Sequence, residues 1–149
     1  MMTEMLFYHL ERQSLEQALP QLLEASLKRG WRVVVQTDSD ERVKALNAHL
    51  WTYREDSFLP HGCATDGEAA RQPIWLTSET ETPNQAQVLF LVDGAVRTDI
   101  AEFERCVHIF DGGDATAVTA ARTHWQQAKE KGLTTTYYRQ TPQGKWEKA

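Results

Sequence analysis

Residues 14–36 read SLEQALPQLLEASLKRGWRVVVQ, and they predict one helix that is followed directly by one strand. Ser14 and Gln17 have the spacing of a capping box, and leucines then recur at helical intervals until Gly30, a residue typical of helix ends. Pro20 lies inside this pattern, so we expect it to kink the helix or delay its start. The β-branched run WRVVVQ predicts a strand that is buried on both faces.

The flanking sequence continues this alternation of helix and strand. Strands are predicted at residues 5–10, 73–78, 88–93, 106–110 and 133–140, and helices after Ser39, at residues 98–105 and at residues 115–131. Helices between buried strands predict an α/β fold of three layers, α/β/α, with a largely parallel sheet that is covered on both faces. The segment 51–66 carries Pro60 and Gly62 and is expected to be a loop or a broken helix. We expect one domain over residues 1–149.

The composition indicates a globular cytoplasmic protein. Hydrophobic residues make up 41% of the chain and charged residues 25%. No apolar run approaches the ~20 residues of a membrane span, and the N-terminus lacks the pattern of a secretory signal. Two cysteines, Cys63 and Cys106, are too few for a disulfide framework, which fits a reducing compartment.

Charge is distributed unevenly along the chain. Residues 1–114 carry a balance of −9 and residues 115–149 a balance of +4, which together give the net charge of −5. The basic part also holds aromatic residues, and its members are Arg122, Lys129, Lys131, Arg139, Lys145 and Lys148 with Trp125, Tyr137, Tyr138 and Trp146. A cationic aromatic face on an acidic protein favours an acidic peptide as ligand, because nucleic-acid binders usually carry a domain-wide positive field. The alternative is a solubilising tail.

Catalytic and cofactor motifs are weak or missing. No loop has the spacing of a phosphate-binding motif, and the nearest candidate, residues 111–114 (DGGD), predicts a turn with a helix cap, since its carboxylates would repel phosphate. His61 and Cys63, with His108 or His124 as a third ligand, would form only an incomplete zinc site. We therefore expect no catalytic residue, no metal and no cofactor, and a protein that is not an enzyme.

Over nearly its whole length the chain resembles the chi subunit of bacterial DNA polymerase III, a small accessory protein of the clamp loader. The resemblance rests on the order and spacing of LFYHL, KRGWRVVV, ALNAHLW, SFLPHG, PIWL, VLFLVDG, AARTHWQQAKEKG and a terminal GKW. It implies a nucleotide-binding-like topology that lacks a phosphate loop. It also implies two partners, the psi subunit and the acidic, phenylalanine-terminated C-terminal tail of single-stranded DNA-binding protein, with DNA contacted only indirectly.

The resemblance places the tail site on the helix that contains AARTHWQQAKEKG. The arginine of the family falls on Arg122 and the following aromatic residue on Trp125, and this spacing puts both on one helical face. Two positions that are basic in members of the family are Gln126 and Val118 here, and Lys129 or Lys131 compensates only partly, so we expect weaker and less salt-sensitive binding of the tail. The alternatives are that Trp125 belongs to the core and that Arg122 is an ordinary solvated charge.

The resemblance places the psi contact on the segment that matches LW…SFLPHG. Phe58 falls on an apolar position that packs against psi in the family, with Trp51, Leu59 and Pro60 nearby. An aromatic side chain on a proline-broken loop suits an interface anchor. The alternative is that Trp51 closes the preceding helix and that Phe58 caps the core.

These expectations combine into a non-enzymatic replisome adaptor that links the clamp loader, through psi, to the tail of single-stranded DNA-binding protein. Two other functions stay open. One is a direct single-stranded nucleic-acid binding module that uses Tyr137, Tyr138 and Arg139. The other is a small nucleotide-dependent enzyme of Rossmann-like fold.

Overall fold

The computed structural model describes residues 3–11, 13–52, 60–143 and 145–148. Its elements, in chain order, are β1 (Glu4–Leu10), α1 (Leu15–Lys28), β2 (Val33–Gln36), α2 (Asp40–Thr52), the 3-10 turn η1 (Ala69–Arg71), β3 (Ile74–Thr77), β4 (Val88–Leu91), the 3-10 turn η2 (Ile100–Glu102), β5 (Arg105–Asp111), α3 (Ala115–Glu130), β6 (Thr134–Gln140) and β7 (Trp146–Lys148). Among the described residues, no helix combines the length and apolar character that a membrane span requires.

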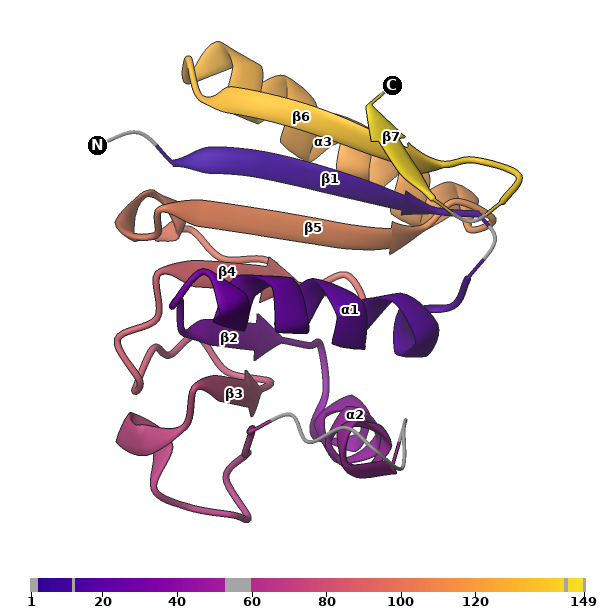
Figure 1. Ribbon diagram of the computed structural model, residues 1–149. Helices are drawn as coiled ribbons and strands as arrows, with labels where there is room; N and C mark the ends of the chain where they lie inside the picture. The colour runs from indigo at the N-terminus through magenta and orange to yellow at the C-terminus, as the bar shows by residue number, and fades with distance from the viewer. Residues whose placement is uncertain (1–2, 12, 53–59, 144, 149) are drawn as a thin grey trace.

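The strands form one open sheet in the order β3-β2-β4-β5-β1-β6-β7. All pairs are parallel except the last, in which β7 runs antiparallel to β6. Figure 1 shows α1 and α2 on one face of the sheet and α3 behind the other face. The predicted α/β fold with three layers and a largely parallel sheet is confirmed.

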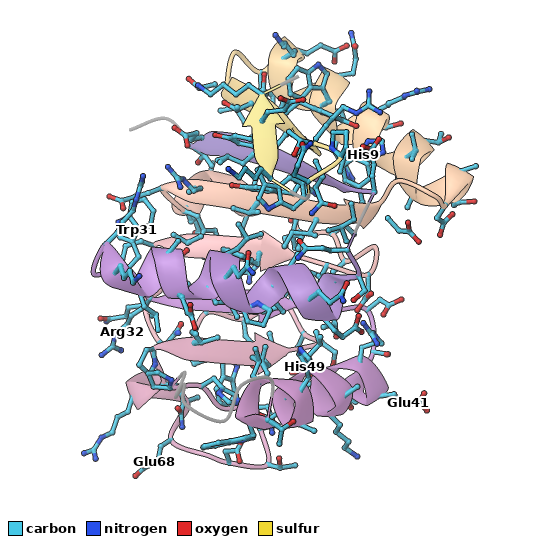
Figure 2. The ribbon with its side chains drawn as sticks, turned by 45° about the vertical axis from the view of Figure 1, so that its right-hand side comes forward. His9, Trp31, Arg32, Glu41, His49 and Glu68 are labelled. Carbon is cyan, nitrogen blue, oxygen red and sulfur yellow. The ribbon has the colours of Figure 1, made fainter. Side chains whose placement is uncertain are left out.

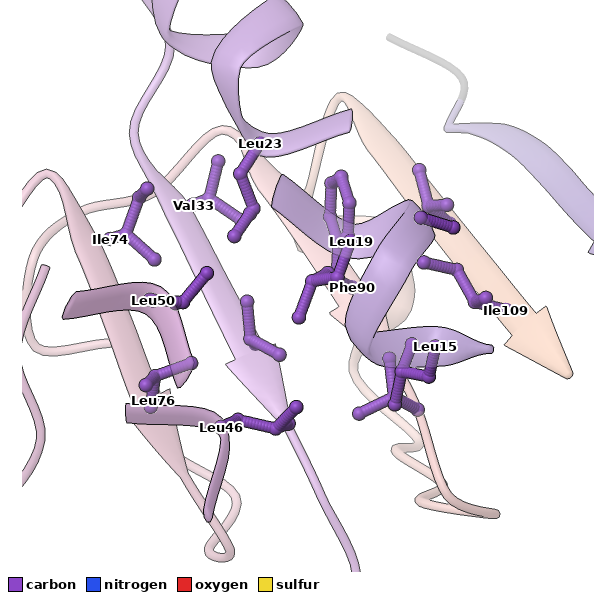
Figure 3. Packing of buried hydrophobic residues seen from close by; sticks show 14 of the residues in the cluster. Leu15, Leu19, Leu23, Val33, Leu46, Leu50, Ile74, Leu76, Phe90 and Ile109 are labelled. Carbon is purple, nitrogen blue, oxygen red and sulfur yellow. The ribbon is translucent and has the colours of Figure 1, made fainter. Parts of the chain in front are cut away.

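The sheet separates two hydrophobic cores. On the side of α1 and α2, Leu19, Leu23 and Leu46 pack with strand residues such as Phe90, as Figure 3 shows. On the side of α3, a second core holds Phe7, Leu89, Ala121 and Ala128 among its members. Neighbouring valines of β2 belong to different cores, because successive side chains of a strand point to opposite faces. The prediction that this strand is buried on both faces is therefore confirmed.

The first helix begins where its cap predicts and not where Pro20 would delay it. Both hydrogen bonds of the capping box between Ser14 and Gln17 are present, and α1 starts at Leu15. The expected delay is wrong because the cap satisfies the amides of the first turn. Proline has no N–H, so the carbonyl of Glu16 four residues earlier lacks its helical donor, and Nε2 of His49 on α2 bonds to this carbonyl over 2.5 Å.

The expected helix at residues 98–105 is wrong. Only η2 is helical there, and β5 already begins at Arg105. The guanidinium of Arg97, whose side chain is 1% exposed, forms a two-pronged pair with Asp99 and also donates to the carbonyl of Glu81. These hydrogen bonds of Arg97 hold the chain in a loop, and Phe103 is buried at the end of that loop.

Helices cover only part of the face that carries α1. The connections at residues 78–87 and 92–104 contain no α-helix, and none of the described helices lies over β1 and β6 on this side (Figure 1). Aromatic side chains lie there instead. Tyr8 stacks on Tyr138 with ring centres 4.8 Å apart, and Trp146 of the unexpected strand β7 meets Tyr8 edge-on at 4.9 Å. The expected cover on both faces therefore fails at this edge of the sheet.

Candidate functional site

The loop at residues 111–114 caps α3 with its own carboxylates. Asp114 accepts hydrogen bonds from the amides of Thr116 at 3.0 Å and Ala117 at 3.3 Å, and Asp111 accepts from the amide of Gly113 at 2.8 Å. These amides are the donors that a phosphate loop would offer to a nucleotide. The predicted turn with a helix cap is confirmed.

The five residues expected to bind the tail lie along one side of α3. Arg122, Gln126 and Lys129 are exposed, while Val118 and Trp125 are half-buried. Ala121 and Ala128 lie on the adjoining side of the helix, next to Trp125, and are buried in the core. The guanidinium of Arg122 is thus accessible to a ligand in solution.

Trp125 belongs partly to the core and partly to the surface. Its ring meets Phe7 edge-on at 5.4 Å and Tyr137 edge-on at 5.8 Å, which ties it to the sheet. The ammonium of Lys129 lies 5.1 Å from the centre of the same ring, which is the geometry of a cation–π contact. The two alternatives for Trp125 therefore both describe part of its environment.

The tertiary structure adds His9, which sequence reasoning missed, to this surface, and it brings His9 together with Tyr137 of the basic, aromatic part of the chain. The hydroxyl of Tyr137 lies 2.6 Å from Nδ1 of His9, which Figure 2 shows near α3. Burial lowers the pKa of His9 and raises the pKa of Tyr137, and the charge of Arg122 acts on both groups as a smaller influence. No sequence signal joins these positions, because they lie on β1 and β6, which become neighbours only in the sheet.

The residues of the alternative nucleic-acid platform do not share one face. Tyr137 faces α3, whereas Tyr138 stacks on Tyr8 at the other face of the sheet. Arg139 pairs with Glu11. A stacking platform needs several rings on one accessible surface, and β6 does not present these two in that way.

A groove of about 990 Å³ opens at the carboxyl ends of β1, β4 and β5. Arg42 lies in its wall and is held by Glu16 at 2.7 Å and by Asp93 at 2.8 Å. A smaller hollow of about 180 Å³ adjoins it at the pair His108 and His124, which line both. None of the five residues expected to bind the tail lines either of these two hollows.

The segment expected to contact psi is described only in part. Trp51 lies in the last turn of α2 with 50% of its surface exposed, and its ring centre is 4.7 Å from that of His61. Pro60 is half-buried. Phe58 and Leu59 lie outside the described residues. Trp51 therefore ends its helix and also presents a large apolar surface to solvent.

The residues of the weak zinc pattern lie in separate places, with His61 and Cys63 before β3, His108 on β5 and His124 on α3. His61 bonds through Nε2 to the carbonyl of Asn47 at 3.2 Å, and the thiol of Cys63 contacts Asp66. His108 and His124 stack on each other, 4.9 Å apart, at β5 and α3. Within the described ranges, no group of three or more histidine, cysteine or acidic side chains is arranged to hold a metal ion.

Comparisons with known proteins agree on one family. The family model described as "DNA polymerase III chi subunit, HolC" matches residues 2–136. The chain is also similar to "Probable DNA polymerase III subunit chi" of Rickettsia prowazekii (strain Madrid E), with 29% identity over 109 residues. This alignment covers 73% of the chain and 66% of the relative, which is slightly less than two thirds of the relative's length. The matched range of the family includes both expected contact surfaces.

Proposed function

The chain belongs to the DNA polymerase III chi subunit family, and from this premise we propose that it is a non-enzymatic adaptor of the replisome. The family associates it with the DNA polymerase III holoenzyme as an accessory subunit. In the proposed role it links the clamp loader, through psi, to the C-terminal tail of single-stranded DNA-binding protein. The polymerase would then stay attached to template that is coated with that protein.

The observation that carries this proposal is the exposed guanidinium of Arg122 beside the half-buried ring of Trp125. Arginine binds a terminal carboxylate or an aspartate with two parallel hydrogen bonds. The indole, with the ring of Tyr137 edge-on at 5.8 Å, offers an apolar wall to the terminal phenylalanine. An acidic peptide with an aromatic end meets both features within one turn of α3.

Other charges on this surface favour a modest affinity. Lys129 adds one cation over the ring of Trp125, while Gln126 and Val118 add none. A flexible tail also loses conformational freedom when it binds, which offsets much of the interaction free energy. We expect dissociation constants on the order of micromolar for one tail, and avidity when several tails are presented together.

The psi contact is proposed at the exposed indole of Trp51. Half of this residue is accessible, and a tryptophan at the end of a helix supplies a large anchor area. His61 supports the ring on one side, with the two ring centres 4.7 Å apart. The surface lies at the end of the sheet near β3, whereas the tail site lies on α3 over β1, β5 and β6, so both partners can bind together (Figure 1).

The tail contact is tested by titrating the full chain with an acidic peptide that ends in phenylalanine, followed by fluorescence anisotropy. Arg122→Ala is expected to weaken binding several-fold, because a charge-assisted hydrogen bond is lost. Arg71→Ala is the matched control, since this arginine is exposed on η1. Equal affinities for all three proteins would remove the proposed site. Tight, salt-sensitive binding of naked single-stranded DNA would instead favour the nucleic-acid module.

A further inference from the structure

The 990 Å³ groove lies where the connections of two neighbouring strands diverge. β1 and β5 are adjacent and parallel, but the chain leaves β1 through α1 on one face and leaves β5 through α3 on the other (Figure 1). In open α/β sheets the crevice at such a point is the usual ligand site. Here the groove is walled by the first residues of α1, the start of α2, the first three turns of α3 and the loop after β4. The tail and psi surfaces described above do not line it.

The polar lining of the groove is rich in acceptors. Its carboxylates are Glu16, Asp38, Asp93, Asp111 and Asp114, and among the described residues that line it the only lysine or arginine is Arg42. Arg42 is occupied, since its guanidinium donates to Glu16 and to Asp93. An anion such as a phosphate is therefore disfavoured here, while a cation finds several negative charges around one guanidinium that is already paired with two of them.

A buried imidazole in the wall points to a ligand independently of these charges. His108 is 8% exposed and lines the groove, and no residue in the described part of the chain forms a hydrogen bond with its ring. The ring is held by stacking against Phe7 at 4.9 Å and against His124 at 4.9 Å. The ring nitrogens of His108 are not sealed from solvent, so a donor that enters the groove can reach them and supply the hydrogen bond that the described residues do not.

The two imidazoles can act as acceptors at neutral pH. Burial lowers the pKa of His108 to about 3, with His124 as a smaller cause, and burial also lowers the pKa of His124. Both rings are thus neutral at pH 7, and each keeps a nitrogen lone pair. A group that only donates hydrogen bonds, such as an ammonium or a guanidinium, complements these lone pairs and the carboxylates together.

The remaining walls are apolar and suit a hydrocarbon stem. Leu15, Ile109, Phe110 and Ala117 line the groove, and Val96 lies at its edge with 59% of its surface exposed. Beyond the histidine pair, the smaller hollow is lined by Lys131 and by Arg97. Asp99 balances the charge of Arg97, so Lys131 supplies the remaining positive charge of the smaller hollow. The larger groove carries most of the carboxylates, so the cation of a ligand belongs there.

We propose that this groove binds an aliphatic cation, an alkyl chain that ends in ammonium or guanidinium groups, with the charged end among the carboxylates and a donor directed at His108. The proposal goes beyond the adaptor function and uses none of its residues. Two sources supply this chemistry: a free polyamine, or a lysine or arginine side chain of a partner protein.

The test is a calorimetric titration of the full chain with spermidine, with agmatine and with a short capped peptide that contains one arginine. We expect saturable one-to-one binding of at least one probe. Tighter binding of spermidine or agmatine would indicate a free polyamine as the ligand, and tighter binding of the peptide would indicate a side chain of a partner protein. Asp38→Asn removes an exposed carboxylate of the groove and is expected to weaken binding about two- to fivefold. Glu41→Gln is the control, because this exposed residue in the first turn of α2 does not line the groove and the change removes the same charge.

Two further measurements keep the result specific. Nitrogen chemical shifts of the His108 and His124 rings are expected to change on saturation. Ala120→Lys adds a covalently attached cation to the groove wall at an exposed position, so the change should not disturb the fold. It is expected to abolish binding, because the added ammonium repels the cation of the ligand. The proposal is overturned by the absence of saturable binding, by unchanged imidazole shifts, or by equal losses in Asp38→Asn and Glu41→Gln. Arg122→Ala should leave cation binding intact. A failure of the cation-binding proposal can therefore be distinguished from a failure of the proposed adaptor function.

Discussion

His49 donates a hydrogen bond from Nε2 to the backbone carbonyl of Glu16 over 2.5 Å, and this is the carbonyl that Pro20 leaves without a helical donor. A side chain of α2 thus satisfies a backbone group of α1. The contact joins the two helices that cover the same face of the sheet (Figure 1). A buried or half-buried carbonyl without a partner would otherwise be costly.

The first prediction follows from this contact. His49→Ala is expected to lower the free energy of unfolding by about 1–3 kcal/mol, because the carbonyl of Glu16 loses its donor. Pro20→Ala restores a helical N–H, so His49→Ala should cost less in that background. Urea unfolding of the wild type, both single variants and the double variant measures the coupling. Strictly additive effects would show that His49 does not substitute for the missing amide.

The second prediction concerns the cations that this chain lacks. Gln126→Lys places an ammonium on the exposed side of α3 beside Arg122, so we expect about two- to fivefold tighter binding of the acidic peptide and a steeper decrease with salt. Gln21→Lys is the matched control, since Gln21 is exposed on α1. Anisotropy titrations at low and high salt measure both quantities. An equal gain in the two variants would indicate general charge attraction and no local site.

The third prediction concerns stability at acidic pH. His108 has a pKa of about 3 in the folded protein because it is buried, whereas an unfolded chain has a histidine pKa near ~6.5. The unfolded state therefore binds more protons between these values, and stability present above about pH 6.5 is lost as the pH falls toward about 3. The maximum slope for one such group is about 1.4 kcal/mol per pH unit.

The measurement is the urea midpoint at several pH values for the wild type and for His108→Leu. We expect the variant to lose part of the acid sensitivity, while His9 and His124, whose pKa values are also lowered by burial, retain the rest. Identical pH profiles for the two proteins would contradict the assignment to His108. The leucine variant is compared with itself across pH, so any change in its overall stability does not affect the test.

The fourth prediction separates folding from partner binding at Trp51. Because half of this residue is exposed, Trp51→Ala is expected to change the thermal midpoint only slightly but to abolish co-elution with psi. Trp75→Ala is the contrasting variant, since this ring is 4% exposed in the second core and its loss should lower the midpoint strongly. Normal co-elution of Trp51→Ala with psi would remove this residue from the interface.

Much of the fold was predictable because its signals are local. The capping box before Leu15, the β-branched run of β2 and the cap at Asp114 each act within a few residues, and each was confirmed. The helix expected at residues 98–105 was wrong because the pattern of apolar residues there does not reveal that Arg97 is buried by a two-pronged bond to Asp99 and by the carbonyl of Glu81. The bond to Glu81 depends on the tertiary structure, and the short pattern of residues 98–105 does not reveal it.

Most of the order of helices and strands, apart from β7 and the helix expected at residues 98–105, follows from the amino-acid sequence, as do the cap of α3 and the positions of Arg122 and Trp125 on one helical side. Capping, periodicity and helical spacing are properties of short segments. The residues that these side chains contact do not follow from the sequence alone. Tyr137 reaches Trp125 and His9 only because β6 pairs with β1, and the acidic groove with His108 in its wall exists only because β1 and β5 lie side by side. Strand pairing joins residues more than a hundred positions apart, and the free energy that selects it comes from burying both faces of the sheet at once.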